Sequence, residues 1–445
     1  MNSDHESIIA ADQTYVWHPY TQAKLSGVPL FIERAEGIYL YGHDGKSYID
    51  AVGSWWVNCH GHCHSKLIEA LHHQAQQLEH VIFAGITHRP AVKLAEALIN
   101  FAGAPFQKVF FSDNGSTAVE VAMKMAWQYF SNKVHQKNQI IAYRNAYHGD
   151  TFGAMSVSGR SIFTAAYEPL LFDVKFIDPP YPGQEEESNR QLMELLQNED
   201  VAAFIFEPLL QGAGGMLTYS ADALDQQIAL CKEFNVLCIA DEVFTGFYRT
   251  GEALAIHHLK YRPDIVCLSK ALSGGMLPLG VTIATESIFE AFLSDDRNKT
   301  FFHGHSFTAN PMSCAVALAS LKLFDDFDYL KHIKELSYLQ EQFAIQISDH
   351  QAVKSARHIG VVVAVEFHSL ADSGYLNAYL GDAFNFFLER GVLIRPLGNV
   401  LYLVPPFIIN SKELAQLHRT IVDYADYLLT RPYGKKQFES SENFD

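Results

Sequence analysis

The chain of 445 residues has no apolar run long enough to cross a membrane. Its most apolar stretches, such as IGVVVAVEF, fall far short of the roughly 20 residues that a transmembrane helix needs. The first residues, MNSDHESIIA, are polar and acidic and show neither the basic start nor the apolar run of a secretory signal peptide. We therefore expect a soluble protein without a membrane partner.

Cysteine and basic residues are both scarce. The six cysteines are scattered through apolar stretches such as VLCIADE and IVCLSKA, as expected of reduced, buried thiols in a cytoplasmic protein. Lys and Arg total 33 against 50 Asp and Glu, which gives a net charge of −17. This balance argues against a general nucleic-acid binder, which would need a basic face, although a local pocket can still hold a small anion.

One short stretch is rich in potential metal ligands. NCHGHCH contains Cys59, His60, His62, Cys63 and His64, at a spacing that would suit a zinc site. No second Cys/His pair follows at the usual distance in the sequence, so a turn leading into the helix SKLIEALHHQAQQL is favoured. We expect no metal, and a non-catalytic zinc-dependent binding protein is the alternative from another functional class.

The middle of the chain alternates short apolar runs with longer helical patterns, which predicts an α/β fold with a mostly parallel sheet and helices on both faces. The predicted strands are 108–112, 138–144, 174–178, 201–208, 236–243, 264–271 and 279–285. Because apolar residues make up 48% of this long chain, we expect two or three domains or subdomains.

The two ends of the chain differ from the middle. After Asp325, charged helices alternate with strands around HIGVVVAVEF and VLIRPLGNVLYLVPPF, and near the N-terminus GIYLYGHDGKSYID predicts two strands with a turn at HDG. We predict an N-terminal arm and part of a small domain over 1–60, and a large domain over 61–325. Residues 326–445 form the rest of a small α+β domain, with a solvated tail. The arm around WHPYTQ precedes any recognisable helix or strand.

The stretch FFSDNGSTAVEVAMKMA predicts a strand, a turn and then a helix. Backbone N–H groups at a helix start, with Gly115 permitting close approach and Ser116 and Thr117 adding hydroxyls, can hold a phosphate. Ser and Thr are also ordinary N-cap residues, so this pattern alone leaves both interpretations open.

Asp241 and Lys270 each end a buried apolar strand, where an isolated charge is costly. In a parallel α/β sheet both side chains would emerge at the carboxyl edge, where ligands bind. A salt bridge between them is one explanation. Pyridoxal phosphate is the other, because it needs a carboxylate for its ring nitrogen, a lysine for its aldehyde and a cradle for its phosphate.

Six stretches resemble, in order, the motifs of the class III aminotransferases: NGSTAVEVAMKMA, AYHGDTFGAMSVSG, EPLLQGAGGM, ADEVFTGFYRTG, LSKALSGGMLPLG and HGHSFTANPMSCA. WHPYTQ, GSWW and RPLGNVLYLVPP resemble more narrowly the members that make 7,8-diaminopelargonic acid in biotin biosynthesis. The resemblance implies a fold-type I homodimer that uses pyridoxal 5′-phosphate. It also implies transfer of an amino group from S-adenosylmethionine to 8-amino-7-oxononanoate.

The same resemblance implies roles for individual residues near the cofactor. Lys270 would bind the cofactor covalently and then carry the proton, and Asp241 would pair with the ring nitrogen. Gly115 and Ser116 would hold the phosphate, and Tyr147 would stack on the ring. Gln211 is a looser candidate for a place near the phenolic oxygen of the cofactor.

A second group of residues is expected either to enter the site from a partner subunit or to lie near the cofactor. His305 and Ser306, where the family usually has Pro-Thr, would reach the phosphate from the other subunit of a homodimer, and Gly304 beside them is a candidate substrate contact. Glu207 is interpreted as a buried hydrogen-bonding partner. The family pattern Phe-Gly-Arg is here Phe247-Tyr248-Arg249, which leaves the role of Arg249 open.

Substrate recognition is expected from residues far apart in the sequence. Arg395 would bind the substrate carboxylate, Trp55 with Trp56 would wall its apolar chain, and Tyr20 would act as a lid residue that helps in recognition. Asp150 and Tyr402 are possible further contacts.

Two alternatives stay within the same family. Another class III enzyme acting on an ω-amino acid, such as 4-aminobutyrate or ornithine, would share the cofactor residues and differ at Tyr20, Trp55 and Arg395. The same reaction with lysine as donor is the second alternative, and the tyrosine at position 20 favours S-adenosylmethionine.

Overall fold

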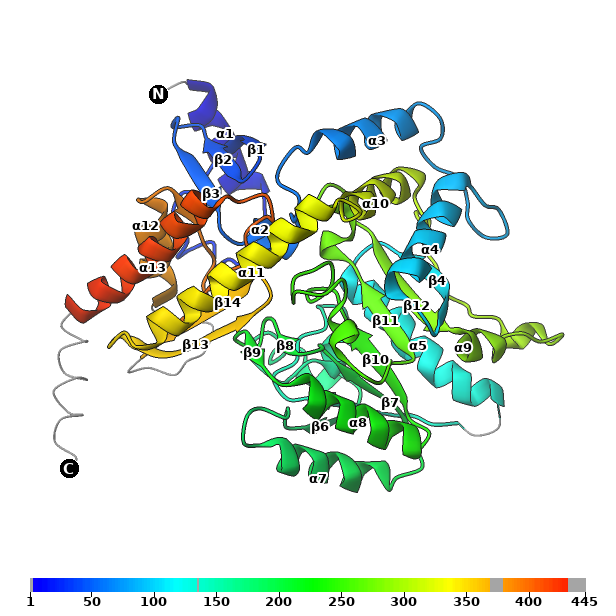
Figure 1. Ribbon diagram of the computed structural model, residues 1–445. Helices are drawn as coiled ribbons and strands as arrows, with labels where there is room; N and C mark the ends of the chain where they lie inside the picture. The colour runs from blue at the N-terminus through cyan, green and yellow to red at the C-terminus, as the bar shows by residue number, and fades with distance from the viewer. Residues whose placement is uncertain (1–2, 134–135, 369–378, 431–445) are drawn as a thin grey trace, which may run out of the picture.

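The computed structural model of the chain describes residues 3–133, 136–368 and 379–430 (Figure 1). Its largest sheet has the strand order β4-β12-β11-β10-β7-β5-β6. The bounds of these strands are β4 Phe106–Ser112, β12 Gly280–Thr285, β11 Ile265–Leu268, β10 Leu237–Asp241, β7 Val201–Phe206, β5 Gln139–Tyr143 and β6 Lys175–Ile177. Each strand predicted for the middle of the chain is therefore confirmed, with ends shifted by a few residues.

The sheet is mostly parallel, as predicted, with one reversed strand. β12 runs antiparallel to both β11 and β4, whereas the other neighbouring pairs are parallel. Only the short 3-10 helix η3 (Lys270–Ser273) lies between β11 and β12. A parallel return needs a crossover of a dozen or more residues, so this short connection allows only the antiparallel pairing.

Helices cover both faces of this sheet, because its strands alternate apolar side chains between two cores. In β10, Ile239 belongs to the core under α5 (Gly115–Lys133), α6 (Phe152–Val157) and α9 (Glu286–Glu290). Ala240 belongs to the opposite core, which packs against α4 (Arg89–Ala102), α7 (Glu185–Leu196) and α8 (Ala221–Glu233). Burial on both faces explains the continuous apolar runs in the sequence.

The two ends of the chain meet in a second part of the molecule, where the blue and the orange-to-red segments lie together in Figure 1. β15 (Val392–Leu393) joins the sheet of β1 (Ile32–Glu36), β2 (Tyr39–Gly42) and β3 (Ser47–Asp50), and it runs parallel to β3. A further sheet contains β13 (Val353–Ile359), β14 (Val362–Phe367) and β16 (Val400–Leu403), and it is accompanied by α11 (Phe327–Ser348), α12 (Tyr379–Leu388) and α13 (Ser411–Thr430). The domain boundaries at residues 60 and 325 stay a prediction, and the tail KKQFESSENFD lies outside the described residues.

The remaining elements lie outside these sheets or form a short strand pair. They are α1 (Ser3–Tyr15), α2 (Gly53–Trp56), α3 (Ser65–Ala75), α10 (Pro311–Leu323) and the strand pair β8 (Leu210–Gln211) with β9 (Leu217–Thr218). Short 3-10 helices are η1 (Glu168–Leu170), η2 (Ala255–His258) and η4 (Arg297–Lys299). The sequence did not predict α1, because SDHESIIAADQTY has no apolar stripe at helical spacing.

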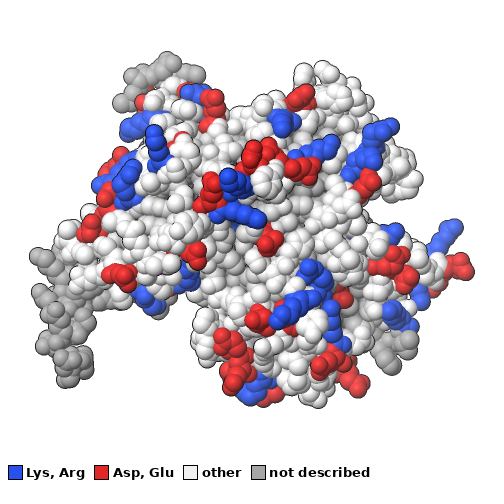
Figure 2. All heavy atoms as spheres, in the orientation of Figure 1, with Lys and Arg blue, Asp and Glu red and all other residues white. Residues whose placement is uncertain are grey.

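Charges of both signs are interspersed over the face drawn in Figure 2, rather than gathered by sign. Over the described ranges, no helix has the length and apolar character needed to cross a bilayer.

At Gly360, the hairpin of β13 and β14 contacts the backbone of the loop 249–251 of the large domain. Gly360 has φ +56°, and the next residue, Val361, donates its N–H to the carbonyl of Arg249 at 3.0 Å. A Cβ at position 360 would lie 2.3 Å from that carbonyl oxygen and 2.4 Å from the nitrogen of Gly251. Only glycine therefore allows this close backbone contact.

We predict that Gly360→Ala lowers the thermal stability by several degrees, because both the left-handed backbone and the contact with Arg249 oppose a Cβ. Gly183→Ala is the matched control, since Gly183 also has positive φ (+83°) but nothing lies within 4 Å of its Cβ position. The melting temperatures of both variants are measured by calorimetry. Equal decreases in the two variants would show that the contact of residue 360 with Arg249 does not contribute.

Candidate active site

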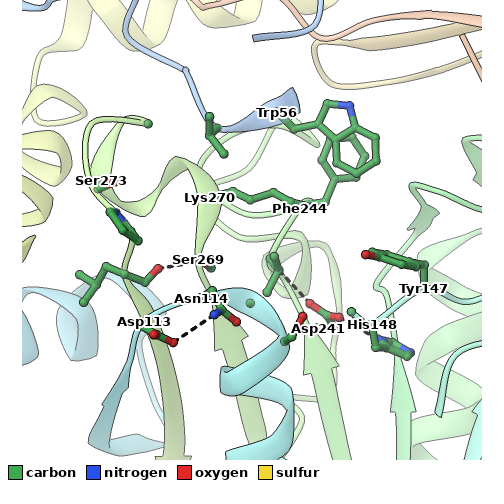
Figure 3. A pocket seen from close by; sticks show the side chains of 18 of the residues that line it. Trp56, Asp113, Asn114, Tyr147, His148, Asp241, Phe244, Ser269, Lys270 and Ser273 are labelled. Atoms are coloured by element: carbon green, nitrogen blue, oxygen red, sulfur yellow. Dashed lines mark hydrogen bonds and ion pairs between the residues drawn. The ribbon is translucent and has the colours of Figure 1, made fainter. Parts of the chain in front are cut away.

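A cavity of about 350 Å³ lies where β10 and β11 end and α5 begins. Figure 3 shows its lining side chains, which come from segments spread over much of the sequence. They include Trp56, Gly115, Ser116, Tyr147, His148, Glu207, Asp241, Phe244 and Lys270. The sequence predicted five of these as cofactor residues, and the structure brings all five to this cavity: Gly115, Ser116, Tyr147, Asp241 and Lys270.

Lys270 begins η3 directly after β11, in the left-handed conformation with φ +42°. Its Nζ lies 4.4 Å from the ring centroid of Trp56 and 5.6 Å from that of Phe244, and Figure 3 shows the side chain reaching toward these rings. Burial lowers the pKa of Lys270 from 10.5 to about 8, although Asp241 opposes the shift. The amine is therefore partly neutral, and hence nucleophilic, near physiological pH.

Asp241 ends β10 and is almost fully buried. One carboxylate oxygen lies 2.7 Å from Nδ1 of His148, and the other accepts the N–H of Val243 at 3.0 Å. Among the described residues no ion pair joins Asp241 to Lys270, so the simple salt bridge considered from the sequence is wrong. Asp241 is held by His148 and a backbone N–H, and it lines the cavity, where it can face a cation.

His148 is a site residue that the sequence analysis missed. It is buried, and its Nε2 has no hydrogen-bond partner within the described ranges. The bond from Nδ1 to Asp241 fixes the orientation of the carboxylate. In the sequence, only the position of His148 beside Tyr147, after a predicted strand, could have suggested a role in the site. That position does not reveal its contact with Asp241, which is 93 residues away.

The start of α5 forms an open anion site. The side-chain oxygen of Asn114 accepts the N–H of Thr117 at 2.9 Å, so Asn114 caps the helix, and the hydroxyl of Thr117 donates to Asp113 at 3.0 Å. The prediction that this hydroxyl serves a phosphate therefore finds no support. The N–H groups of Gly115 and Ser116, in the first helical turn, lack intrahelical carbonyl partners.

Glycines allow the segments around this anion site to pack closely. A Cβ at Gly115 would lie 2.7 Å from Val243, and one at Gly149 would lie 2.1 Å from the hydroxyl oxygen of Ser116. Together with Lys270 and Asp241, this cradle fits pyridoxal phosphate, because an anion site, an amine and a carboxylate share one cavity.

Glu207 and Gln211 behave differently from each other. Glu207 is buried and accepts the N–H groups of Tyr147 and Gly212, each at 3.0 Å, as the sequence interpretation expected. Burial raises its pKa to about 7. Gln211 accepts from the hydroxyl of Tyr181 and donates to the carbonyl of Arg144, so its amide is used outside the cavity lining and its suggested place near the cofactor is not supported.

The predicted substrate residues converge beside this cavity. The hydroxyl of Tyr20 donates to the carboxylate of Asp150 and lies 3.1 Å from that of Tyr147. The ring of Tyr20 is 5.2 Å from Trp55, and the guanidinium of Arg395 lies 4.6 Å from the Trp55 ring centroid. Residues separated by 375 positions thus form one surface.

Phe163 is a second residue that the sequence analysis missed. Its ring contacts Tyr20 at 5.8 Å and Tyr147 at 6.5 Å between centroids, so it closes the aromatic wall beside the cavity. It lies outside helices and strands in SGRSIFTAA, where no periodic pattern could have marked it. Tyr402, suggested as a further contact, is buried and packs edge-on against Trp56 at 6.0 Å.

Gly304, His305 and Ser306 do not line the cavity of the single chain. His305 was expected to reach the cofactor phosphate, but its N–H donates a hydrogen bond to the hydroxyl of Thr308 at 3.0 Å in the single chain. Their predicted role in the site of a partner subunit stays a prediction.

Arg249 has a structural role in this chain. Its guanidinium is fully buried and donates to the carbonyls of Pro405, Trp56 and Asn58 at 3.0, 3.4 and 3.2 Å. It therefore ties the N-terminal and C-terminal segments to the large sheet.

The side chains of NCHGHCH have separate partners. His60 lies between Ser320 and Tyr329, at 3.0 and 2.9 Å, and His62 lies 2.9 Å from the carboxylate of Asp50. Over the described part of the chain, no cluster of three His, Cys, Asp or Glu side chains suits a metal ion.

Comparisons with known proteins agree with this site. Residues 20–424 match the family model described as aminotransferase class-III. The adenosylmethionine-8-amino-7-oxononanoate aminotransferase of Synechococcus elongatus is 44% identical, over 93% of this chain and 98% of its own length. The protein of the same name from Helicobacter pylori is 36% identical, over 95% and 98%.

Solved structures show the same likeness. The crystal structure of adenosylmethionine-8-amino-7-oxononanoate aminotransferase from Methanocaldococcus jannaschii matches with a TM-score of 0.90 at 35% identity, covering 95% of this chain and 99% of the other. An omega transaminase from Pseudomonas jessenii in complex with PMP matches with a TM-score of 0.87 at 29% identity, covering 95% and 98%.

The lowered pKa of Lys270 leads to a prediction for the cofactor-free protein. Only the neutral amine attacks an aldehyde, so the initial rate of binding of added pyridoxal 5′-phosphate should rise with pH and level off above a midpoint near 8. The rate is followed by the growth of visible absorbance, with Lys270→Ala as the blank. A rate that kept rising about tenfold per pH unit up to pH 10, as for an ordinary lysine, would contradict the desolvated amine.

Proposed function

This chain belongs to the class III aminotransferase family, and from that membership we propose that it transfers the amino group of S-adenosylmethionine to 8-amino-7-oxononanoate. The product is 7,8-diaminononanoate, in the pathway of biotin biosynthesis. The enzyme depends on pyridoxal 5′-phosphate. The observation that carries the proposal is the meeting of Tyr20, Trp55 and Arg395, next to the cavity lined by Tyr147 and Lys270. These three are the residues in which the ω-amino-acid enzymes are expected to differ.

The cofactor, when bound, supplies an aldehyde that takes up amino groups and a ring that withdraws electrons. Lys270 would hold the cofactor through Nζ, and once released from it the amine would be a base placed beside the substrate carbon. Its pKa of about 8 suits it to accept the proton from that carbon and to return it at the neighbouring position. The rings of Trp56 and Phe244 exclude water from the amine.

Asp241 would stabilise positive charge at the ring nitrogen of the bound cofactor. His148 and the N–H of Val243 fix both of its oxygens, so the carboxylate cannot rotate away. The N–H groups of Gly115 and Ser116 hold the phosphate at the start of α5. Tyr147, positioned by the bond of its N–H to Glu207, supplies the ring that stacks on the cofactor.

The substrate surface suits a long chain that ends in a carboxylate. Arg395 stacks on Trp55 and is half-buried, so a carboxylate bound there is partly shielded from water. Trp55 and Phe163 offer apolar walls for methylene groups, and Tyr20 with Asp150 offers polar groups for the amine end.

We also propose a homodimer in which Gly304, His305 and Ser306 complete the site of the partner. Phe302 and Phe307, on both sides of this stretch, are 74% and 64% exposed in the single chain. Two large apolar side chains beside a predicted active-site segment are what an interface between copies would bury. The enzyme is proposed to work in the cytoplasm, because all six cysteines are free thiols.

The direct test is an assay of the purified protein with 8-amino-7-oxononanoate and one amino donor at a time. S-adenosylmethionine should give 7,8-diaminononanoate by mass spectrometry, while lysine, ornithine and 4-aminobutyrate should give little. Product with lysine alone would change the donor, and amino transfer restricted to ω-amino acids would overturn the proposed function.

Arg395→Ala should raise the KM for 8-amino-7-oxononanoate by tens- to hundreds-fold, since a charge-assisted contact at a partly buried site contributes about 2–3 kcal/mol. Arg190→Ala is the control, because Arg190 forms exposed ion pairs with Glu187 and Glu194 on α7. Steady-state kinetics of both variants decide the point. An unchanged KM would remove Arg395 from carboxylate binding.

Tyr20→Phe should leave cofactor affinity within about twofold and lower turnover by about tenfold or more, because it deletes only the hydroxyl bonded to Asp150 and Tyr147. Tyr20→Ala should be slower still, since the apolar contact with Trp55 is lost too. Single-turnover measurements with each substrate alone identify the half-reaction that suffers. Normal rates in both half-reactions would make WHPYTQ a packing segment.

A further inference from the structure

The short helix α2 that carries both tryptophans of the site is a left-handed turn. Gly53, Ser54, Trp55 and Trp56 have φ values of +54°, +46°, +68° and +74°. This conformation costs roughly 1–2 kcal/mol for each residue that has a Cβ. Three consecutive non-glycine residues persist there only if surrounding contacts outweigh that cost.

The strain has a clear geometric consequence. Trp55 faces Tyr20 and Arg395, whereas Trp56 is buried and covers Nζ of Lys270. A right-handed turn would send the two indoles in other directions, so the left-handed conformation is needed for one tryptophan to serve the substrate side and the other the lysine.

The turn Gly53–Trp56 is held by the buried carboxylate of Asp50. Asp50, at the end of β3, is fully buried, and its Oδ2 accepts the hydroxyl of Ser54 at 2.8 Å. Its Oδ1 accepts the N–H of Val52 at 3.3 Å. Because Ser54 is the second residue of the turn, the position of the carboxylate determines where the turn begins.

The carboxylate is in turn held by a histidine of the NCHGHCH stretch. Nε2 of His62 lies 2.9 Å from Oδ2 of Asp50, and Nδ1 lies 3.1 Å from the amide nitrogen of Asn58. The amide nitrogen of Asn58 can only donate, so Nδ1 accepts and Nε2 carries the proton donated to Asp50. The side chain of His62 is 13% exposed.

The backbone of His62 is fixed as well. Its N–H donates to the carbonyl of Gly37 at 2.6 Å, and its own carbonyl accepts the N–H of Gly37 at 3.1 Å. The imidazole therefore reaches Asp50 from an anchored backbone, and it cannot follow the carboxylate if the turn moves.

We propose that His62 is a positioning residue for the two active-site tryptophans. Through Asp50 and Ser54 it holds the left-handed turn Gly53–Trp56 in the conformation that places Trp55 beside Arg395 and Trp56 over Lys270. The NCHGHCH stretch thereby has a role that needs no metal. The proposal goes beyond the proposed substrate because it concerns the geometry of the protein itself.

The test compares two substitutions of the same side chain. His62→Phe keeps the ring volume but removes the donor, while His62→Gln keeps an N–H near the position of Nε2. The holoenzyme is labelled with 5-fluorotryptophan, and its four fluorine signals are assigned by single Trp→Phe replacements. Trp127, whose indole N–H donates to the carbonyl of Asn138, is the internal reference.

In His62→Phe we expect the signals of Trp55 and Trp56 to shift or broaden while that of Trp127 stays unchanged. The kcat/KM for 8-amino-7-oxononanoate should fall by about 10- to 100-fold, the loss expected for a misplacement of roughly 1 Å. His62→Gln should restore both properties, with kcat/KM within about threefold of the unaltered enzyme. His72→Phe, the same change on the exposed face of α3, is the control and should change neither.

Unchanged Trp55 and Trp56 signals in His62→Phe would overturn the proposal, and so would a Gln variant as impaired as the Phe variant. If His62→Phe does not fold, Ser54→Ala removes the other donor to Oδ2 and should shift the same two signals. Unchanged Trp55 and Trp56 signals in Ser54→Ala would also overturn the proposal. The fluorine measurement uses no substrate, so an enzyme that made no 7,8-diaminononanoate would refute the proposed function alone.

Discussion

Two neighbouring parallel strands, β10 and β11, determine where the chemistry takes place. Asp241 pairs in register with Cys267, so both strands end at one edge of the sheet and Lys270 follows two residues after β11. A carboxylate and an amine buried at the same edge would pair if they could, and pairing would raise the pKa of the lysine. Instead Asp241 is held by His148 and a backbone N–H, and the lysine stays desolvated under Trp56. Separation of the two groups keeps both available to a ligand.

Three residues proposed to contact substrate are brought to this edge by the ends of the chain, namely Tyr20, Trp55 and Arg395. Arg249 makes that arrangement possible, because its buried guanidinium binds carbonyls of Trp56, Asn58 and Pro405. A charged group without a buried carboxylate partner can be accommodated in this way, since three carbonyl dipoles replace the lost water. The guanidinium thus joins the N-terminal and C-terminal segments over the sheet edge, beside the tryptophan turn and near the strand that leads to Arg395.

Electrostatics inside the site follow from the exclusion of water. The carboxyls of Glu207 and Glu242 are fully surrounded by protein, and burial raises the pKa of each to about 7. Backbone N–H groups bind both, from Tyr147 and Gly212 to Glu207, and from Ala255 and Ile256 to Glu242. These carboxyls therefore act as fixed acceptors that hold the backbone of the loops beside the cavity.

The sequence by itself predicted the strands of the large sheet, the family and five of the residues that line the cavity. Buried strands are continuous apolar runs, and a charged residue that ends such a run must face a ligand or a partner, so Asp241 and Lys270 could be found from local pattern alone. The reversed direction of β12, the helix α1 and the capping of α5 by Asn114 were missed, because loop length, weak amphipathicity and N-cap chemistry are ambiguous in one sequence. Only the tertiary structure decided which distant groups meet: His148 with Asp241, Phe163 with Tyr20, and His62 with Asp50. Such contacts depend on how loops and chain ends pack over a sheet edge, and no periodicity along the chain encodes a hydrogen bond between residues that only folding brings together.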